Sequence, residues 1–158
     1  MSTTRIVIGC DHAAVALKDE IVKELRGSGQ QVEDVGTFTG DSVDYPDFAA
    51  MVAGLIRSGT ADLGIVMCGT GIGVSIAANK LPGIRAALCH DVTTARLARQ
   101  HNDSNILCMG GRVLGSAVAL DIVRTWLSTP FEGGRHLRRI RKIEAIESQA
   151  CAPEEKGR

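Results

Sequence analysis

The chain has 158 residues, of which 44% are apolar and 3% aromatic, and its 18 basic side chains are balanced by 18 acidic ones. This length and composition predict one globular domain with its own core and exclude a disordered chain. The zero net charge and the shortage of aromatic rings argue against nucleic acid as a partner, and no apolar run is long enough to cross a membrane.

Strand-like and helix-like segments alternate along the whole chain. Strands are expected in short apolar runs at 5–9, 31–35, 62–67, 84–89 and 105–109. Helices are expected at 13–26, from 45 to about 57, at 74–80, from a cap at Asp91 or Thr93 to about 101, from about 115 to 128, and from about 134 to 147. Pro46 suits the first turn of the second helix.

Successive strand–helix units with short connections predict a mostly parallel sheet with helices on both faces. The expected fold is therefore α/β: a three-layer αβα sandwich around a five-stranded, Rossmann-like parallel sheet, with one additional C-terminal helix. No linker or internal repeat divides the chain, so residues 1–148 are expected to form a single domain. The polar residues 149–158 are expected to form a flexible tail.

Five cysteines, at positions 10, 68, 89, 108 and 151, have neither the spacing of a Cys/His zinc site nor that of a redox pair. We therefore expect reduced thiols and no bound metal. The four apolar residues after Arg5 are too few for the core of a signal peptide. Together these features favour a cytoplasmic protein.

The segment around Cys68 combines a thiol with a glycine-rich loop. Cys68 follows a predicted strand, glycines stand at 69, 71 and 73, and a predicted helix begins at Val74. Backbone N–H groups of such a loop bind anions, and a cysteine at a helix N-terminus readily becomes a thiolate. A tight turn around a small buried cysteine is the simpler interpretation. Three glycines in five residues exceed what a turn needs, so we favour an anion-binding loop, although neither the dinucleotide fingerprint nor the P-loop pattern is present.

Other polar residues follow neighbouring strands, and ligands of open α/β sheets bind where strands end. Asp11 follows the first strand and suits the N-cap of the first helix. His12 lies in the first turn of that helix, where the dipole disfavours a cation unless an anion is bound. Arg112 follows the fifth strand after two glycines.

Simpler interpretations also stay open for the remaining candidates. His101 ends a predicted helix, where a C-terminal cap is sufficient to explain a histidine. Arg135 and Arg139 share one helix face and suit a phosphate clamp, yet a basic run is usually a solvated face. His90 and His136 are expected on solvated surfaces.

Several motifs occur in order between Arg5 and Glu147, and together they resemble the type B ribose-5-phosphate isomerases, a family that also holds galactose-6-phosphate isomerase subunits. The motifs are Gly9-Cys-Asp-His-Ala13, Asp44-Tyr-Pro-Asp47, Cys68-Gly-Thr-Gly-Ile-Gly73 with Ile76-Ala-Ala-Asn-Lys80, Arg99-Gln-His-Asn-Asp-Ser-Asn105, Gly110-Gly-Arg112 and Phe131-Glu-Gly-Gly-Arg-His136. One branch of that family carries Glu at the position of Val74 and lacks the cysteine. Cys68 therefore assigns this chain to the cysteine branch.

The resemblance implies an enzyme of carbohydrate metabolism, in the pentose phosphate pathway, that interconverts ribose 5-phosphate and ribulose 5-phosphate through an enediolate without metal or cofactor. It implies that Cys68 is the base that moves the proton between C1 and C2, and that Thr70 assists at the substrate oxygens. Asp11 and His101 would serve sugar binding and ring opening. The implied substrate-binding residues are Gly69, Gly71, Ile72 and Gly73 at the enediolate, Tyr45 and Asn102 at the sugar, and His12, Arg112, Arg135 and Arg139 at the phosphate.

The resemblance further implies a homodimer or a dimer of dimers, with each active site built across a subunit interface. His101, Asn102 and Arg112 would reach the site from the neighbouring subunit. The phosphorylated sugar and a second copy of the chain are thus the expected partners, with no nucleic acid and no membrane.

Two alternatives remain open from the sequence. The same residues suit an isomerase of a tetrose phosphate or a hexose 6-phosphate, because pocket length depends on loops such as Phe38–Asp44. A non-catalytic phosphosugar-binding module would explain the phosphate ligands. It would not explain why Cys68, Thr70 and His101 occur together.

Overall fold

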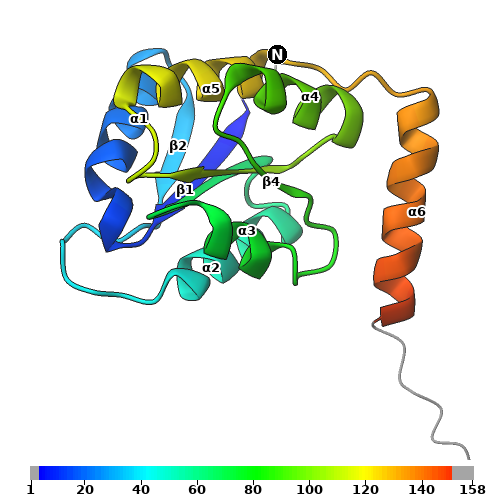
Figure 1. The fold of residues 1–158 in the computed structure, drawn as a ribbon, viewed down its shortest axis with the longest axis horizontal. Helices are drawn as coiled ribbons and strands as arrows, with labels where there is room; N and C mark the ends of the chain where they lie inside the picture. The colour runs from blue at the N-terminus through cyan, green and yellow to red at the C-terminus, as the bar shows by residue number, and fades with distance from the viewer. Residues whose placement is uncertain (1–3, 151–158) are drawn as a thin grey trace, which may run out of the picture.

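A parallel sheet forms the centre of the fold (Figure 1). It has five strands in the order β2-β1-β3-β5-β4. The structure is a computed structural model and describes residues 4–150. The strands are β1 (Arg5–Cys10), β2 (Gln31–Asp34), β3 (Leu63–Cys68), β4 (Ala86–Leu88) and β5 (Ile106–Gly110). The chain builds outward in opposite directions from β1 and β3, so the carboxyl ends of these two strands form the switch point where open α/β sheets bind ligands.

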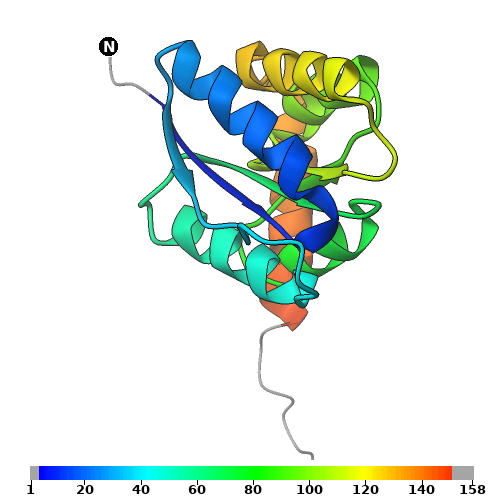
Figure 2. The same cartoon turned by 90° about the vertical axis from the view of Figure 1, so that its left-hand side faces the viewer.

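Helices cover both faces of the sheet, and a last helix stands beside it (Figures 1 and 2). They are a short 3-10 helix (His12–Ala14), α1 (Val15–Gly27), α2 (Tyr45–Arg57), α3 (Ile72–Ala78), α4 (Val92–Asn102), α5 (Ser116–Ser128) and α6 (Arg135–Ala150). One face carries α1, α4 and α5, and the other carries α2 and α3. The predicted α/β sandwich with an additional C-terminal helix is therefore confirmed.

The two apolar layers arise from the alternation of side chains along each strand. Ile6 and Ile8 face the layer under α1 and α5, whereas Val7 between them faces the layer under α2. Because both faces are buried, the strands are almost continuously apolar, which made them visible in the sequence. Trp126, the only tryptophan of the chain, is fully buried in the first layer, and its Nε1 donates to Ser104 Oγ at 2.7 Å.

The helix starts differ in detail from the sequence prediction. Asp11 caps the first turn as expected and accepts from the Ala13 N–H at 2.9 Å, but that turn is a 3-10 helix. Asp91, rather than Thr93, caps α4 and accepts from the Thr94 N–H at 2.8 Å. The third helix begins two residues before the predicted start, because Gly71 adopts a left-handed conformation that turns the chain into it.

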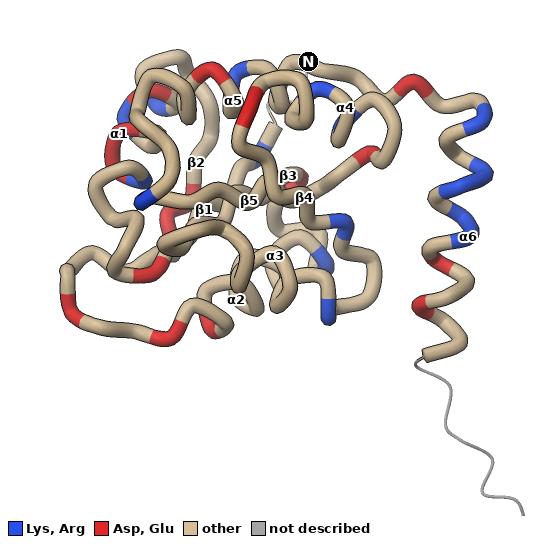
Figure 3. Tube along the Cα trace, viewed as in Figure 1, with Lys and Arg blue, Asp and Glu red and all other residues tan. Residues whose placement is uncertain are grey.

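Charge is unevenly distributed along α6 (Figure 3). Basic side chains fill its first half, residues 135–142, and Glu144 and Glu147 follow in the second half. The helix continues through residues 149 and 150, which the sequence assigned to the tail, and residues 151–158 lie outside the described part. Within the described chain, no helix combines the length and the apolar character that a membrane span requires.

Candidate active site

An open pocket of about 440 Å³ lies at the carboxyl ends of β1 and β3, the switch point of the sheet. Its size is in the range of small-molecule sites. Seven of the residues predicted for the site contribute to its lining, together with the exposed side chain of Ile76. The lining consists of Asp11, Tyr45, Cys68, Gly69, Thr70, Ile72, Gly73 and Ile76.

The Cys68 thiol lies at the end of β3 and is 4% exposed. Its Sγ accepts a hydrogen bond from the Gly71 N–H at 3.2 Å. The next N–H, that of Ile72, donates to Thr70 Oγ1 at 3.3 Å. The N–H groups of the first turn of α3 have no carbonyl partner within the helix, so the pocket combines one thiol with several backbone donors.

Two of the loop glycines are required by close approaches. Gly71 has a φ of 79°, and a Cβ there would lie 2.6 Å from Leu88 Cδ1 and 2.7 Å from the Met109 carbonyl carbon. At Gly73 a Cβ would lie 2.6 Å from two ring carbons of Tyr45. The glycine pattern therefore lets the loop pack directly against β5 and against the Tyr45 ring.

Arg112 belongs to the same pocket region in its own chain. Its Cδ would lie 3.5 Å from a Cβ built at Gly69, and its N–H donates to the Gly69 carbonyl at 3.0 Å. The reason is that β3 and β5 are adjacent strands, so the loops that follow them meet. That Arg112 reaches the site of a neighbouring subunit, as the resemblance implies, stays a prediction.

His12 lies half-buried in the first turn after β1. Its Nδ1 accepts a hydrogen bond from the Val43 N–H at 3.2 Å. An accepting Nδ1 places the ring proton on Nε2, which leaves an N–H available to an anion. The same bond ties the loop before α2 to the first turn of the chain. Together, Asp11, His12, Tyr45, Arg112 and the loop 68–73 are called the thiol half below.

His101 and Asn102 lie elsewhere, because α4 starts after the carboxyl end of β4 and runs back along the sheet. The last turn of α4 therefore lies at the amino ends of the strands, whereas Cys68 lies at their carboxyl ends. There the His101 ring stacks on His136 of α6, with centroids 4.3 Å apart and planes inclined by 5°. A second group of candidate residues thus forms between α4 and the first turns of α6.

Glu132 joins the two stacked rings. Its Oε2 lies 3.5 Å from His136 Nε2 and 3.9 Å from His101 Nε2. Burial lowers the pKa of His136, and the nearby His101, Arg135 and Arg139 lower it further, while Glu132 opposes them. The residues His101, Asn102, Glu132, Arg135, His136 and Arg139 are called the imidazole half below.

A metal ion is a natural alternative for this cluster, since the ligand atoms of His101, Glu132 and His136 lie within 4.8 Å of one another. An ion binds an imidazole nitrogen in the plane of its ring. The two ring planes are inclined by only 5°, so they do not meet near the two rings and one ion cannot lie in both. The arrangement therefore suits ion-pair contacts of the two imidazoles with Glu132 better than a single bound ion.

The sequence patterns did not identify His136 or Glu132 as residues of this cluster. His136 was expected on a solvated surface, which is wrong: it is 5% exposed. His90 is exposed, as expected. The spacing of His136 and Ile140, four residues apart on one helix face and both buried, was the available signal. Glu132 had no local signal, because its partners come from two helices.

A sequence profile described as Ribose/Galactose Isomerase matches residues 6–143. The chain belongs to the ribose/galactose isomerase family. The protein of Escherichia coli K12 named ribose-5-phosphate isomerase B is 48% identical over 145 residues, which are 92% of this chain and 97% of that protein. These findings confirm the family that the sequence motifs indicated.

Solved structures of the family agree with the fold. Ribose-5-phosphate isomerase B of Clostridium thermocellum matches with a TM-score of 0.92 and 54% identity, over 93% of this chain and 99% of that chain. The enzyme of Mycoplasma genitalium, solved with bound ribulose-5-phosphate, matches with a TM-score of 0.90 and 42% identity, over 94% of this chain and 99% of that chain.

Proposed function

We propose that this member of the ribose/galactose isomerase family interconverts ribose 5-phosphate and ribulose 5-phosphate, with Cys68 as the base. The observation that carries the proposal is the Cys68 sulfur in the lining of a sugar-sized pocket, where it accepts from the Gly71 N–H. The names of the relatives support the substrate, since they are ribose-5-phosphate isomerases B and one holds ribulose-5-phosphate.

The reaction moves one proton between C2 and C1 of the open-chain sugar. The Cys68 thiolate removes the proton from C2 of the aldose, and that electron pair forms the C1–C2 double bond while charge gathers on O1. The C2 hydroxyl proton passes to O1 with the assistance of Thr70. The Cys68 thiol then returns its proton to C1, which gives a C1 hydroxyl and a C2 ketone.

The enediolate needs hydrogen-bond donors aimed at its oxygens. We assign this role to the backbone N–H groups between Gly69 and Val74, since the first turn of α3 leaves its N–H groups without carbonyl partners. Those of Gly71 and Ile72 bond Cys68 Sγ and Thr70 Oγ1 in this structure, so Gly73 and Val74 offer the donors that face no side chain. A thiolate is also a stronger acceptor than a thiol, so the Gly71 N–H suits the basic form of Cys68. Base and donors thus lie on one short segment.

Ring opening precedes proton transfer, because only the linear sugar has an acidic C–H next to a carbonyl. We assign this step to His101 with Asp11, and sugar contacts to Tyr45 and Asn102. The phosphate would be held by the Nε2–H of His12 and by three arginines, Arg112, Arg135 and Arg139.

These roles require a second copy of the chain. The thiol half lies at the carboxyl ends of the strands and the imidazole half at their amino ends, so one chain cannot present both to one sugar. We therefore propose a homodimer, or a dimer of dimers, in which the thiol half of one subunit faces the imidazole half of another. We also propose that the enzyme acts in the cytoplasm, where its substrate class is metabolised.

The test is isomerisation of ribose 5-phosphate by the purified protein in EDTA, with tetrose and hexose phosphates assayed alongside. We expect ribulose 5-phosphate to form fastest, and Cys68→Ala to lose at least about 10³-fold in kcat while substrate binding persists. Turnover of a shorter or longer sugar alone would keep the chemistry and replace the substrate. Binding without turnover of any sugar phosphate would favour the phosphosugar-binding module.

A further inference from the structure

The last turn of α4 ends in an unusual conformation beside His101 and Asn102. Asp103 has φ 43° and ψ 48°, and it is the single non-glycine residue with positive φ in the described chain, residues 4–150. Left-handed backbone is unfavourable for an L-residue unless neighbouring contacts hold it. A helix end also leaves its last carbonyls without partners. Within the turn, the Asp103 and Ser104 N–H groups bond the Arg99 and Ala98 carbonyls, and the Arg99 side chain bonds the Asp103 carboxylate at 2.9 Å. The Asn102 and Asp103 carbonyls are left for stabilisation from outside α4.

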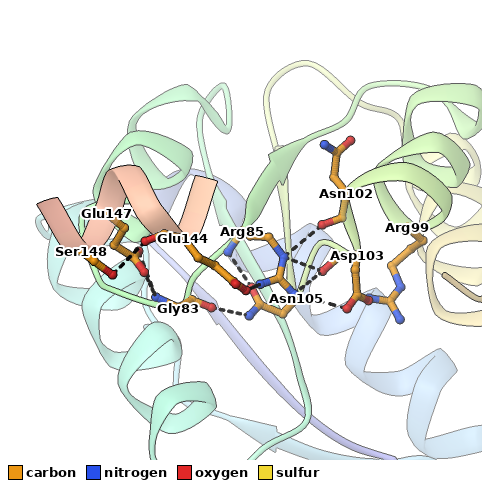
Figure 4. Close-up of polar contacts among 9 residues, drawn as sticks. All are labelled: Gly83, Arg85, Arg99, Asn102, Asp103, Asn105, Glu144, Glu147 and Ser148. Atoms are coloured by element: carbon orange, nitrogen blue, oxygen red, sulfur yellow. Dashed lines mark hydrogen bonds and ion pairs between the residues drawn. The ribbon is translucent and has the colours of Figure 1, made fainter. Parts of the chain in front are cut away.

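Arg85, just before β4, supplies that stabilisation (Figure 4). Its Nε donates to the Asn102 carbonyl at 3.0 Å and to the Asp103 carbonyl at 3.1 Å. Its second terminal nitrogen donates to the Asp103 carbonyl at 2.9 Å and lies 3.3 Å from the Asp103 carboxylate. One guanidinium thus caps two terminal carbonyls and, together with Arg99, holds the left-handed residue.

The same guanidinium reaches toward α6. Its remaining nitrogen lies 3.9 Å from Glu144 Oε1, and the adjoining Gly83 N–H donates to both oxygens of Glu147, at 3.0 and 2.9 Å. Asn105 locks this loop in turn, since its side chain accepts from the Arg85 N–H and donates to the Gly83 carbonyl. The loop 83–85 is therefore the place where α4 and the second half of α6 are joined (Figure 4).

We propose that Arg85 is a positioning residue that fixes the end of α4, and with it His101 and Asn102, relative to α6 and its phosphate-binding arginines. The Arg85 side chain bonds the main-chain carbonyl of Asn102 and not its side chain. It acts through the two helices that carry the imidazole half. This inference rests on the proposed isomerase function, because it assigns the geometry of the same site.

The chemistry of the contact explains why arginine stands here. A guanidinium holds several donors in a rigid plane, so it serves two carbonyls and two carboxylates at once. The Arg85 side chain is 20% exposed, which leaves little room for water to replace those donors. Lysine places its three donors on one nitrogen, so it does not span both helices as the planar guanidinium does.

The two arms of the contact predict different kinetic effects. Loss of the α4 arm displaces His101 and Asn102, and a displacement of about 1 Å at reacting groups costs about 10²-fold in rate. We therefore expect Arg85→Met to lower kcat on ribose 5-phosphate about 30- to 100-fold. Glu144→Gln weakens only the α6 arm, so we expect KM to rise about threefold with kcat retained.

The experiment compares Arg85→Met, Arg85→Lys and Glu144→Gln with Arg96→Met, a matched control on the exposed surface of α4. Arg85→Ala is also assayed with added guanidinium ion, which we expect to restore kcat at least about fivefold without changing the wild type. Circular dichroism, melting temperature and gel filtration establish that each variant is folded and has the size of the wild type. The alkylation rate of Cys68 reports that the thiol half is unchanged.

The outcomes separate the two proposals. Wild-type protein without isomerase activity would remove the proposed function. Active wild type with Arg85→Met and Arg96→Met equally active would overturn the positioning role. The positioning role is also overturned if the Arg85 variants lose activity only in proportion to the fraction of folded protein and added guanidinium does not restore the kcat of Arg85→Ala. Arg85→Lys decides the matter if Arg85→Met does not fold, since a folded lysine variant with wild-type kcat contradicts the proposal.

Discussion

The thiol half and the imidazole half are held in place by different kinds of contact. In the thiol half, most contacts are made by the backbone: the loop after β3 packs on β5 through Gly71, and its N–H groups face the pocket. In the imidazole half, side chains from distant segments hold one another, as Glu132 does between His101 and His136. The first half is preorganised by the sheet, whereas the second depends on how α6 and α4 are joined.

The strongest test of this division is complementation between inactive variants. Cys68→Ala and His101→Ala are refolded together, so that mixed dimers carry one intact site each. If the halves come from different subunits, activity should rise from background to about a quarter of the wild-type value, because half of the dimers are mixed and have one of two sites intact.

The control mixes Cys68→Ala with Asp11→Asn, both in the thiol half. No mixed dimer then has an intact site, so the activity should stay at background. Recovery of activity in this control pair would contradict the shared site. So would a lack of recovery for Cys68→Ala with His101→Ala when the subunits are known to exchange.

A second prediction concerns the backbone of the thiol half. Gly71 and Gly83 have the same φ of 79°, but a Cβ at Gly83 meets nothing within 4 Å, whereas one at Gly71 strikes Leu88 and the backbone of Met109. Gly83→Ala should cost about 1 kcal/mol from backbone strain alone. Gly71→Ala should cost about 3 kcal/mol or more and abolish activity.

Urea unfolding of both variants measures the difference, which isolates the cost of close packing from that of the left-handed conformation. Equal destabilisation would mean that the loop has room to move away from β5. The thiol half would then be less rigid than the imidazole half, and the comparison would be reversed.

The smallest expected effect is a pH dependence in the imidazole half. The pKa of His136 is lowered from its ordinary value of 6.5, first by burial and then by His101 and Arg135. Below that ordinary value the unfolded chain binds the proton more readily, so the free energy of unfolding should fall as the pH is lowered, until the pH passes the pKa of the folded state.

Urea unfolding between about pH 7.5 and about pH 5.5 measures this slope. His136→Gln should reduce it, and His90→Gln, at an exposed position, should leave it unchanged. An identical slope in His136→Gln would show that other groups bind the proton and that the stacked pair is not sensitive to it.

The sequence patterns predicted the features that depend on residues close together in the chain. The five strands, the Asp11 cap and the loop after Cys68 follow from apolar runs, capping preferences and glycine spacing, all of which are local. The stacking of His101 on His136 was not accessible in this way, because it depends on α6 folding back against α4. The role of Arg85 was equally hidden, since its partners lie 17 residues and more away along the chain.

The single tryptophan gives the imidazole half a built-in optical reporter. Trp126 is fully buried, donates to Ser104 just beyond the end of α4, and has the Arg99 guanidinium 5.4 Å from its ring centre. Arg99 in turn bonds Asp103, the residue that Arg85 holds. Because no other indole competes, the fluorescence of the chain senses the polarity around this one helix end. Loosening of that helix end can therefore be followed by the wavelength of the Trp126 emission maximum, in real time and without any label.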